Sequence, residues 1–172
     1  MGYLGGNAGY GQGPGGGVNK GGAGYGGKGG TGRSKPYGSW VTHPGGPTYG
    51  AYPAEPTFGS GGGSNSVCGI AGNGGGAIKI FADSILNNGE IFADGKAPTG
   101  SCPGGGSGGG IYLISNNVFD LDNIYARGGE NGVSTYKGYG GGGGGGRITI
   151  SAPWITGFPS VESRGNGETG TV

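Results

Sequence analysis

Side chains able to do acid–base or metal chemistry are few in this 172-residue chain. It contains one histidine, His43, and two cysteines, Cys68 and Cys102. His43 stands in "WVTHPGG" with no cysteine or acidic residue within ten positions. A lone histidine in a loop is typical of an exposed side chain rather than a catalytic base, and no CxxC spacing occurs. The sequence therefore predicts neither a catalytic histidine nor a metal site.

Paired carboxylates are the other candidates for chemistry, because two of them on one face can cleave a polysaccharide. The candidates for such a pair in the strand-like part of the chain are Asp83, Glu90, Asp94, Asp120 and Asp122. Carboxylates spaced along strands in this way more often lie on the solvent-exposed outer face of the fold. The tract "GGGGGG" at 141–146 also lacks the GK[ST] ending of a phosphate-binding loop. We therefore expect a protein that is not an enzyme and needs no cofactor.

The charge balance restricts the partners. Ten Lys and Arg residues face nine Asp and Glu residues, which gives a formal net charge of +1. This leaves no electrostatic basis for binding nucleic acid or an acidic membrane surface. No apolar run approaches the roughly 18 to 20 residues of a membrane span. We expect no nucleic-acid partner and no membrane insertion.

The spacing of the two cysteines points to the elements that carry them. Cys68 lies eight residues before Gly76, and Cys102 lies eight residues before Gly110. If these are equivalent positions in stacked units, neighbouring strands about 4.8 Å apart fall within the Cα separation of about 4.4–6.8 Å that a disulfide requires. The spacing predicts an intrachain disulfide worth on the order of 4 kcal/mol in an oxidising compartment. Two free thiols in a cytosolic protein are the alternative.

The units themselves are visible as an internal repeat. Placing Gly76, Gly110 and Gly146 in register aligns "GAIKIF", "GIYLIS" and "GRITIS", with starts 34 and 36 residues apart. Each is followed by a second match, "EIFADG", "NIYARG" and "SVESRG", and between the two lies a weaker third segment. Each unit therefore consists of three short strands and a glycine-rich excursion.

Similar units at nearly constant spacing favour stacking. We predict an all-β fold, a parallel β-solenoid of the β-helix kind with about three rungs and long glycine-rich excursions that can adopt polyglycine II. An antiparallel sandwich of the same strands is the alternative. Strand alternation predicts a core ladder formed by Ile78, Ile80, Ile91, Ala93, Tyr112, Ile114, Ile124, Ala126, Ile148, Ile150 and Val161.

A change in composition divides the chain into two regions. Residues 1–66 are rich in Gly, Tyr and Pro, whereas 67–172 contain the strand-like repeats. Collagen is excluded because its glycine frame is interrupted by Gln12, Val18 and Arg33. In "GGAGYGGKGGTG" at 21–32, glycine dominates two of three frames, so a helix with three residues per turn has two bare faces for packing. Packed polyglycine helices and a flexible linker are both consistent with this composition.

Short motifs in the repeats resemble a known class of protein. "GGAI" at 75–78, with "GGIY" at 109–112 and "GGRI" at 145–148, is similar to the repeat of extracellular β-helical adhesins such as the polymorphic outer-membrane proteins. The likeness covers 67–165, and the Phe-x-x-Asn element of those proteins is not matched. The chain also resembles glycine-rich secreted and cell-surface proteins of microbes and algae, and its front half resembles the glycine-rich domain of certain receptor tyrosine kinases, where polyglycine helices bundle. These resemblances imply an extracellular or cell-surface structural role.

Three non-catalytic functions can be compared with this interpretation. A stack of about three rungs exposes unpaired strand edges at both ends, which predicts a structural protein that polymerises head to tail into a filament, sheath or surface appendage. The alternative is a cell-surface adhesive or glycan-binding module, a fragment of a larger repeat protein, that uses exposed Tyr and Trp. Ice binding would need a regular Thr-x-Thr array, which the sequence lacks. The expected partners are other copies of the chain and surface glycans.

Overall fold

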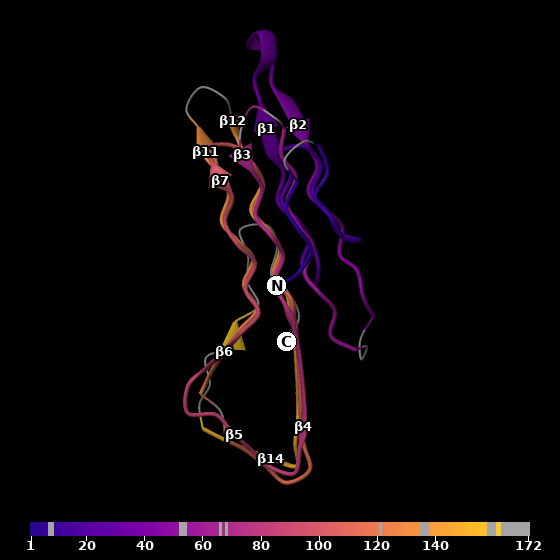
Figure 1. The fold of residues 1–172 in the computed structure, drawn as a ribbon, viewed down its shortest axis with the longest axis vertical. Coiled ribbons are helices and arrows are strands. Elements are labelled where there is room, and N and C mark those ends of the chain that lie inside the picture. The colour runs from indigo at the N-terminus through magenta and orange to yellow at the C-terminus, as the bar shows by residue number, and fades with distance from the viewer. Residues whose placement is uncertain are drawn as a thin grey trace.

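The computed structural model describes residues 1–6, 9–51, 55–65, 67, 69–120, 122–134, 138–157 and 161–162. Within these residues the chain is all-β, with one short 3-10 turn, η1 (Pro36–Gly38), as its helical element. Figure 1 shows strands along a triangular outline at one end, extended segments running side by side through the middle, and short antiparallel strands at the other end. No helix in the described part is long and apolar enough to cross a membrane.

The three repeat units build three parallel sheets. The strands of the first unit are β4 (Ala77–Ala82), β5 (Ile85–Leu86) and β6 (Glu90–Phe92). The strands of the second unit are β8 (Gly110–Ser115), β9 (Val118–Asp120) and β10 (Asn123–Tyr125). The strands of the third unit are β13 (Arg147–Ser151), β14 (Trp154–Thr156) and β15 (Val161–Glu162). The sheet orders are β13-β8-β4, β14-β9-β5 and β15-β10-β6. Each unit is therefore one layer of what we call the strand stack, and the second layer lies between the first and the third.

The hydrophobic core lies inside the strand stack. Its buried members are Ala93, Ile111, Leu113, Phe119, Ile124, Ala126 and Ile148. Most of them belong to the second layer, because that layer is covered on both sides whereas the outer layers are covered on one. Ile124 is completely buried and pairs with Ile91 on one side and with Val161 on the other. These three residues are the ones that the sequence places in one ladder.

The predicted register of β8 was wrong by one residue. Gly110 pairs with Ala77 and Arg147, not with Gly76 and Gly146. Tyr112 and Ile114 therefore do not occupy the inner positions of the core ladder.

Ile111 and Leu113 take those inner positions instead. Ile111 pairs with Ile78 and Ile148, and both Ile111 and Leu113 are buried. The error has a physical cause, because four consecutive apolar residues in β8 offer no alternation from which the inner face can be chosen.

The outer layers bury their ladder residues less completely. Ile80 was expected in the core but is 36% exposed, because β4 is an edge strand with a neighbour on one side only. The half-buried residues that pack on the core from the outer layers are Ile78, Ile85, Ile91, Ile150, Ala152 and Val161.

The glycine tracts form a hydrogen-bonded bundle, which we call the glycine bundle. Its centre is the segment 104–109, whose backbone N–H groups turn in sequence toward three neighbours. Gly104 donates to Gly63 O at 2.9 Å, Gly105 to Gly141 O at 2.9 Å and Gly106 to Lys96 O at 3.0 Å. The next three N–H groups return to the same three segments, at Ser60, Gly144 and Ala93. A repeat of three residues is that of the polyproline II conformation, whose backbone groups all point outward.

The carbonyl groups of the central segment bond three further segments. Gly104 O accepts from Gly72 N, Gly105 O from Ala23 N, and Gly106 O from Gly129 N. Six neighbours therefore surround one chain, and their close approach leaves no space for a side chain at the glycine positions of this segment, whereas the buried hydroxyl of Ser107 accepts a hydrogen bond from Ser60 N. A Cβ on Gly106 would lie 2.0 Å from Asn73 O. This packing explains why the tracts consist of glycine.

The glycine-rich front region and the repeats interleave in this bundle. Ala23 N donates to Gly105 O, and Gly26 N donates to Gly145 O. The composition boundary near residue 66 is therefore not a boundary in space, since the two regions share one hydrogen-bonded body.

Two small antiparallel sheets lie beyond the bundle. One has the order β11-β12-β1-β2, from β11 (Val133–Ser134), β12 (Gly138–Tyr139), β1 (Gly32–Ser34) and β2 (Val41–His43). The other pairs β3 (Gly69–Ile70) with β7 (Thr99–Gly100). The hairpin β1–β2 projects from the end of the molecule opposite the strand stack (Figure 1).

Candidate interaction surfaces

The first layer ends in an edge strand with a free side. Gly110 N donates to Gly76 O at 3.2 Å and Asn116 N donates to Ala82 O at 3.1 Å, so the even-numbered residues of β4 face β8. In a parallel ladder the N–H and C=O of one residue point to the same side, and successive residues alternate. The backbone groups of Lys79 and Phe81 therefore point away from β8, toward the open side of the sheet.

The third layer ends in a matching edge. Arg147 N donates to Gly109 O at 3.0 Å, so Arg147 and the alternate residues after it face β8. The backbone groups of Ile148 and Ile150 consequently point to the free side of β13. Among the described residues no segment pairs with the outer side of β4 or of β13. The two edges present complementary rows of donors and acceptors.

Large apolar side chains are exposed at both end layers. In the first layer Leu86 is 69% exposed and Phe92 64% exposed. In the third layer Trp154 is 69% exposed and Ile155 52% exposed. Apolar side chains gathered at a sheet edge are typical of a surface that is covered by a partner.

A cavity of about 390 Å³ lies where the first layer meets the glycine bundle. Its lining includes the apolar side chains of Met1, Phe58, Ile78 and Phe92, together with Asp94 and Lys96. The cavity belongs to the first-layer end of the strand stack, and no group of metal-binding side chains occurs in it. More generally, the described part of the chain holds no group of three His, Cys, Asp or Glu side chains that could bind a metal ion.

The carboxylate of Asp94 has a structural role. Asp94 in the first layer receives the guanidinium of Arg127 in the second, with Nη2 at 2.6 Å and Nε at 3.0 Å from Oδ2, and the Arg127 N–H at 2.7 Å from Oδ1. This hydrogen bonding raises the pKa of Arg127. The guanidinium also lies over the ring of Tyr125, 4.3 Å from its centroid. The pair therefore fastens one layer to the next.

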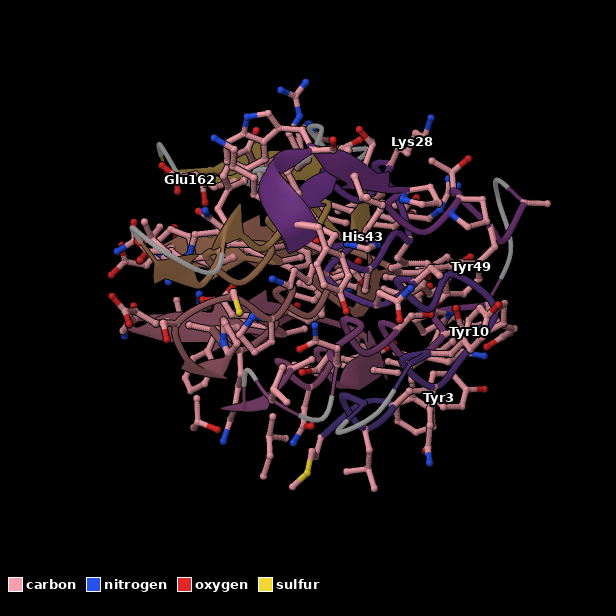
Figure 2. All side chains as sticks on the ribbon, turned by 90° about the horizontal axis from the view of Figure 1, so that it is seen from above. Tyr3, Tyr10, Lys28, His43, Tyr49 and Glu162 are labelled. Carbon is pink, nitrogen blue, oxygen red and sulfur yellow. The ribbon has the colours of Figure 1, made fainter. Side chains whose placement is uncertain are left out.

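Several tyrosines pack instead of offering free rings. Tyr25 is buried and its ring centroid lies 4.8 Å from that of Tyr49. The Tyr49 hydroxyl donates to Phe58 O and accepts from Ser60 Oγ, and burial raises the pKa of Tyr49 to about 12. Tyr3, Tyr10 and Tyr49 line one side of the molecule in Figure 2, and of these Tyr10 is the most exposed.

The remaining residues singled out in the sequence have separate surroundings. Cys102 is completely buried, and no free cysteine occurs in the described part. Cys68 lies outside the described residues, so its pairing with Cys102 stays a prediction. His43 is half-buried, with Nε2 2.8 Å from Ser34 Oγ, and burial and the charge of Lys20 lower its pKa.

Sequence reasoning missed the exposed face of the sheet that contains β1 and β2. The alternation in "GRSKPYGSWVTH" is a signal of a hairpin with one polar face, but the surrounding glycine masks it. Trp40, on that face, is 56% exposed.

In comparisons with known proteins, no family model, no curated protein and no solved structure matches the chain. These findings neither support nor contradict the resemblance of the GGAI-type repeats to extracellular adhesins.

Proposed function

We propose that the protein is an extracellular structural subunit that polymerises head to tail into a filament, sheath or surface appendage. The observation that carries the proposal is the pair of open parallel edges at β4 and β13. In this interpretation the strand stack is a three-rung β-solenoid and the glycine bundle is polyglycine II. The third layer of one copy then adds to the first layer of the next, as the second layer does within the molecule.

The internal register specifies the contact. Ile78 and Ile148 both pair with Ile111 across β8. If the same offset continues between copies, Ile148 lies opposite Ile78 of the next copy and Ile150 lies opposite Ile80. The contact is heterologous and does not close, so it propagates into a fibre. The inward-facing apolar residues of the end layers support it: Ile80 is 36% exposed and Ile155 52% exposed, and a further layer would cover them as the second layer's core is covered.

Backbone substitutions at the two free edges test the proposal. Phe81→Pro removes an N–H that points away from β8, and Ile150→Pro does the same at the other end. Proline is tolerated on edge strands because it removes no internal ladder bond there. Each variant alone should remain monomeric in sedimentation experiments, whereas Phe81→Leu, which keeps the N–H, should polymerise like the unchanged protein.

Mixing the two proline variants provides the decisive experiment. The third layer of Phe81→Pro and the first layer of Ile150→Pro are both intact, so an equimolar mixture should form dimers and stop. Circular dichroism and thermal melting of each variant establish that it is folded. Monomers in the mixture, or polymers from either folded variant alone, would refute the edge-to-edge contact.

A further inference from the structure

The sheet at the far end of the molecule has one inner and one outer face. Gly32 and His43 pair across β1 and β2, and a Cβ on Gly32 would lie 2.2 Å from the carbonyl oxygen of the buried Lys20. His43 is half-buried and bonded to Ser34. This face therefore packs on the glycine bundle.

Alternation places the intervening side chains on the opposite face. Arg33 pairs with Thr42 on one side and with Tyr139 on the other, and Tyr139 pairs with Val133. Two residues further along the hairpin, Lys35 and Trp40 continue the same face. We call this surface the hairpin face; its members are Arg33, Lys35, Trp40, Thr42, Val133 and Tyr139.

Ring contacts link the members of the hairpin face. The rings of Trp40 and Tyr139 lie 6.4 Å apart between centroids, and Lys35 Nζ lies 5.6 Å from the centroid of the Trp40 ring. Trp40 is 56% exposed, and Arg33 and Lys35 are exposed as well. Neither cation belongs to the ion pairs found in the described part, which join Lys79 to Glu55 and Arg127 to Asp94.

The chemistry of this face matches one class of ligand. The exposed ring of Trp40 and the half-buried ring of Tyr139 present an apolar surface with a polar edge, on which the flat face of a sugar can lie. Arg33 and Lys35 add two positive charges beside the rings, and the strands β1, β2, β11 and β12 contain no carboxylate. Guanidinium groups bind carboxylate and sulfate in a bidentate manner.

We propose that the hairpin face binds an anionic polysaccharide, whose sugar rings contact Trp40 and Tyr139 while its carboxylates or sulfates contact Arg33 and Lys35. The site does not depend on the proposed polymerisation. The hairpin lies at the end opposite the strand stack (Figure 1), so glycan binding and stacking of layers use separate surfaces. A polymer with both properties would be held to a polysaccharide along its length.

Tryptophan fluorescence provides a direct test, because Trp40 and Trp154 are the only tryptophans. The variant Trp154→Phe leaves Trp40 as the single reporter. We expect polygalacturonate and dextran sulfate to change its emission, with an affinity that falls as salt is added. Neutral dextran should have a much weaker effect. The response to the two anionic polymers separates carboxylate from sulfate recognition.

A charge-matched pair of variants locates the site. In the Trp154→Phe background, Arg33→Gln with Lys35→Gln should weaken binding about tenfold, since two exposed ion pairs together contribute about that factor. Lys28→Gln with Lys96→Gln removes the same charge from exposed lysines elsewhere and should leave binding unchanged. Melting temperatures of both variants verify that they are folded.

Three results would overturn the proposal. Equal binding of polyglutamate would mean that the face recognises charge alone and not a sugar. Equal binding of neutral dextran would mean that the cations contribute nothing. The absence of any Trp40 response to both anionic polymers would mean that no such site exists on the hairpin face.

Discussion

The substitution Gly106→Ala tests the packing of the glycine bundle. A Cβ at this position would lie 2.0 Å from the backbone oxygen of Asn73, whereas ordinary contact begins at 3.4 Å. The two segments would have to separate by 1.4 Å, and both are backbone, so no side chain can move aside. Gly106 also donates to Lys96 O at 3.0 Å and accepts from Gly129 N at 2.8 Å. The insertion therefore strains two hydrogen bonds as well.

The expected loss follows from these contacts. Overpacking typically costs about 1–3 kcal/mol, and each disrupted hydrogen bond adds about 1 kcal/mol. We expect Gly106→Ala to lower the free energy of unfolding by about 3–5 kcal/mol. Gly89→Ala is the matched control, because its Cβ would meet nothing within 4 Å. It should raise the free energy by about 0.4–1 kcal/mol through the reduced entropy of the unfolded chain.

The two substitutions are chemically identical, so the test is whether they change the free energy of unfolding in opposite directions. Denaturant titrations followed by circular dichroism give both free energies under the same conditions. If Gly106→Ala unfolds at the same denaturant concentration as Gly89→Ala, the central segment is not enclosed by six neighbours and the packing argument fails.

Three other predictions concern the core, the ionisation of a tyrosine and the cysteines. Ile124→Ala should lower the free energy of unfolding by about 2–5 kcal/mol because the residue is completely buried, whereas the exposed Leu86→Ala should change it by less than about 0.5 kcal/mol; thermal and denaturant melting measure both. The pKa of Tyr49 is raised from 10.0 to about 12, so the folded state favours the neutral hydroxyl. The contribution of Tyr49 to the free energy of unfolding is therefore fully present below pH 10 and is lost as the pH rises from 10 to 12. The loss should be smaller in Tyr49→Phe, and identical pH profiles of the two proteins would contradict it. An unreduced digest analysed by mass spectrometry should contain a peptide joined through Cys68 and Cys102, while full alkylation of both thiols in the folded protein would exclude the bond.

The sequence predicted the stacked layers because their repeat survives in short strands. Ile91, Ile124 and Val161 each lie four residues before a glycine, and each is flanked by residues of different polarity. Alternation then identifies the inner side of these strands. The parallel sheets and the all-β character follow from the same repeat.

The register of β8 could not be predicted from alternation. Ile111, Tyr112, Leu113 and Ile114 are all apolar, so either face can be turned inward. Aligning the units on their glycines chose Tyr112. The structure instead pairs Ala77 with Gly110, which turns Ile111 and Leu113 inward and leaves Tyr112 half-buried.

The hydrogen-bonding partners of the glycine tracts could not be predicted from the sequence either. One glycine segment offers the same backbone groups as any other, so nothing in the sequence indicates that Gly105 bonds both Gly141 and Ala23. The hairpin face was missed for a related reason, because the strands that form it come from distant parts of the chain.

The measurement that tests the proposed function most directly is the axial rise per subunit in a helical reconstruction from electron micrographs. Three layers about 4.8 Å apart, continued by the next copy at the same spacing, give a rise of about 14 Å. We expect filaments with this rise and with continuous parallel sheets along the axis. A protein that remains monomeric at high concentration, or filaments whose rise is incompatible with three stacked layers, would contradict the head-to-tail contact.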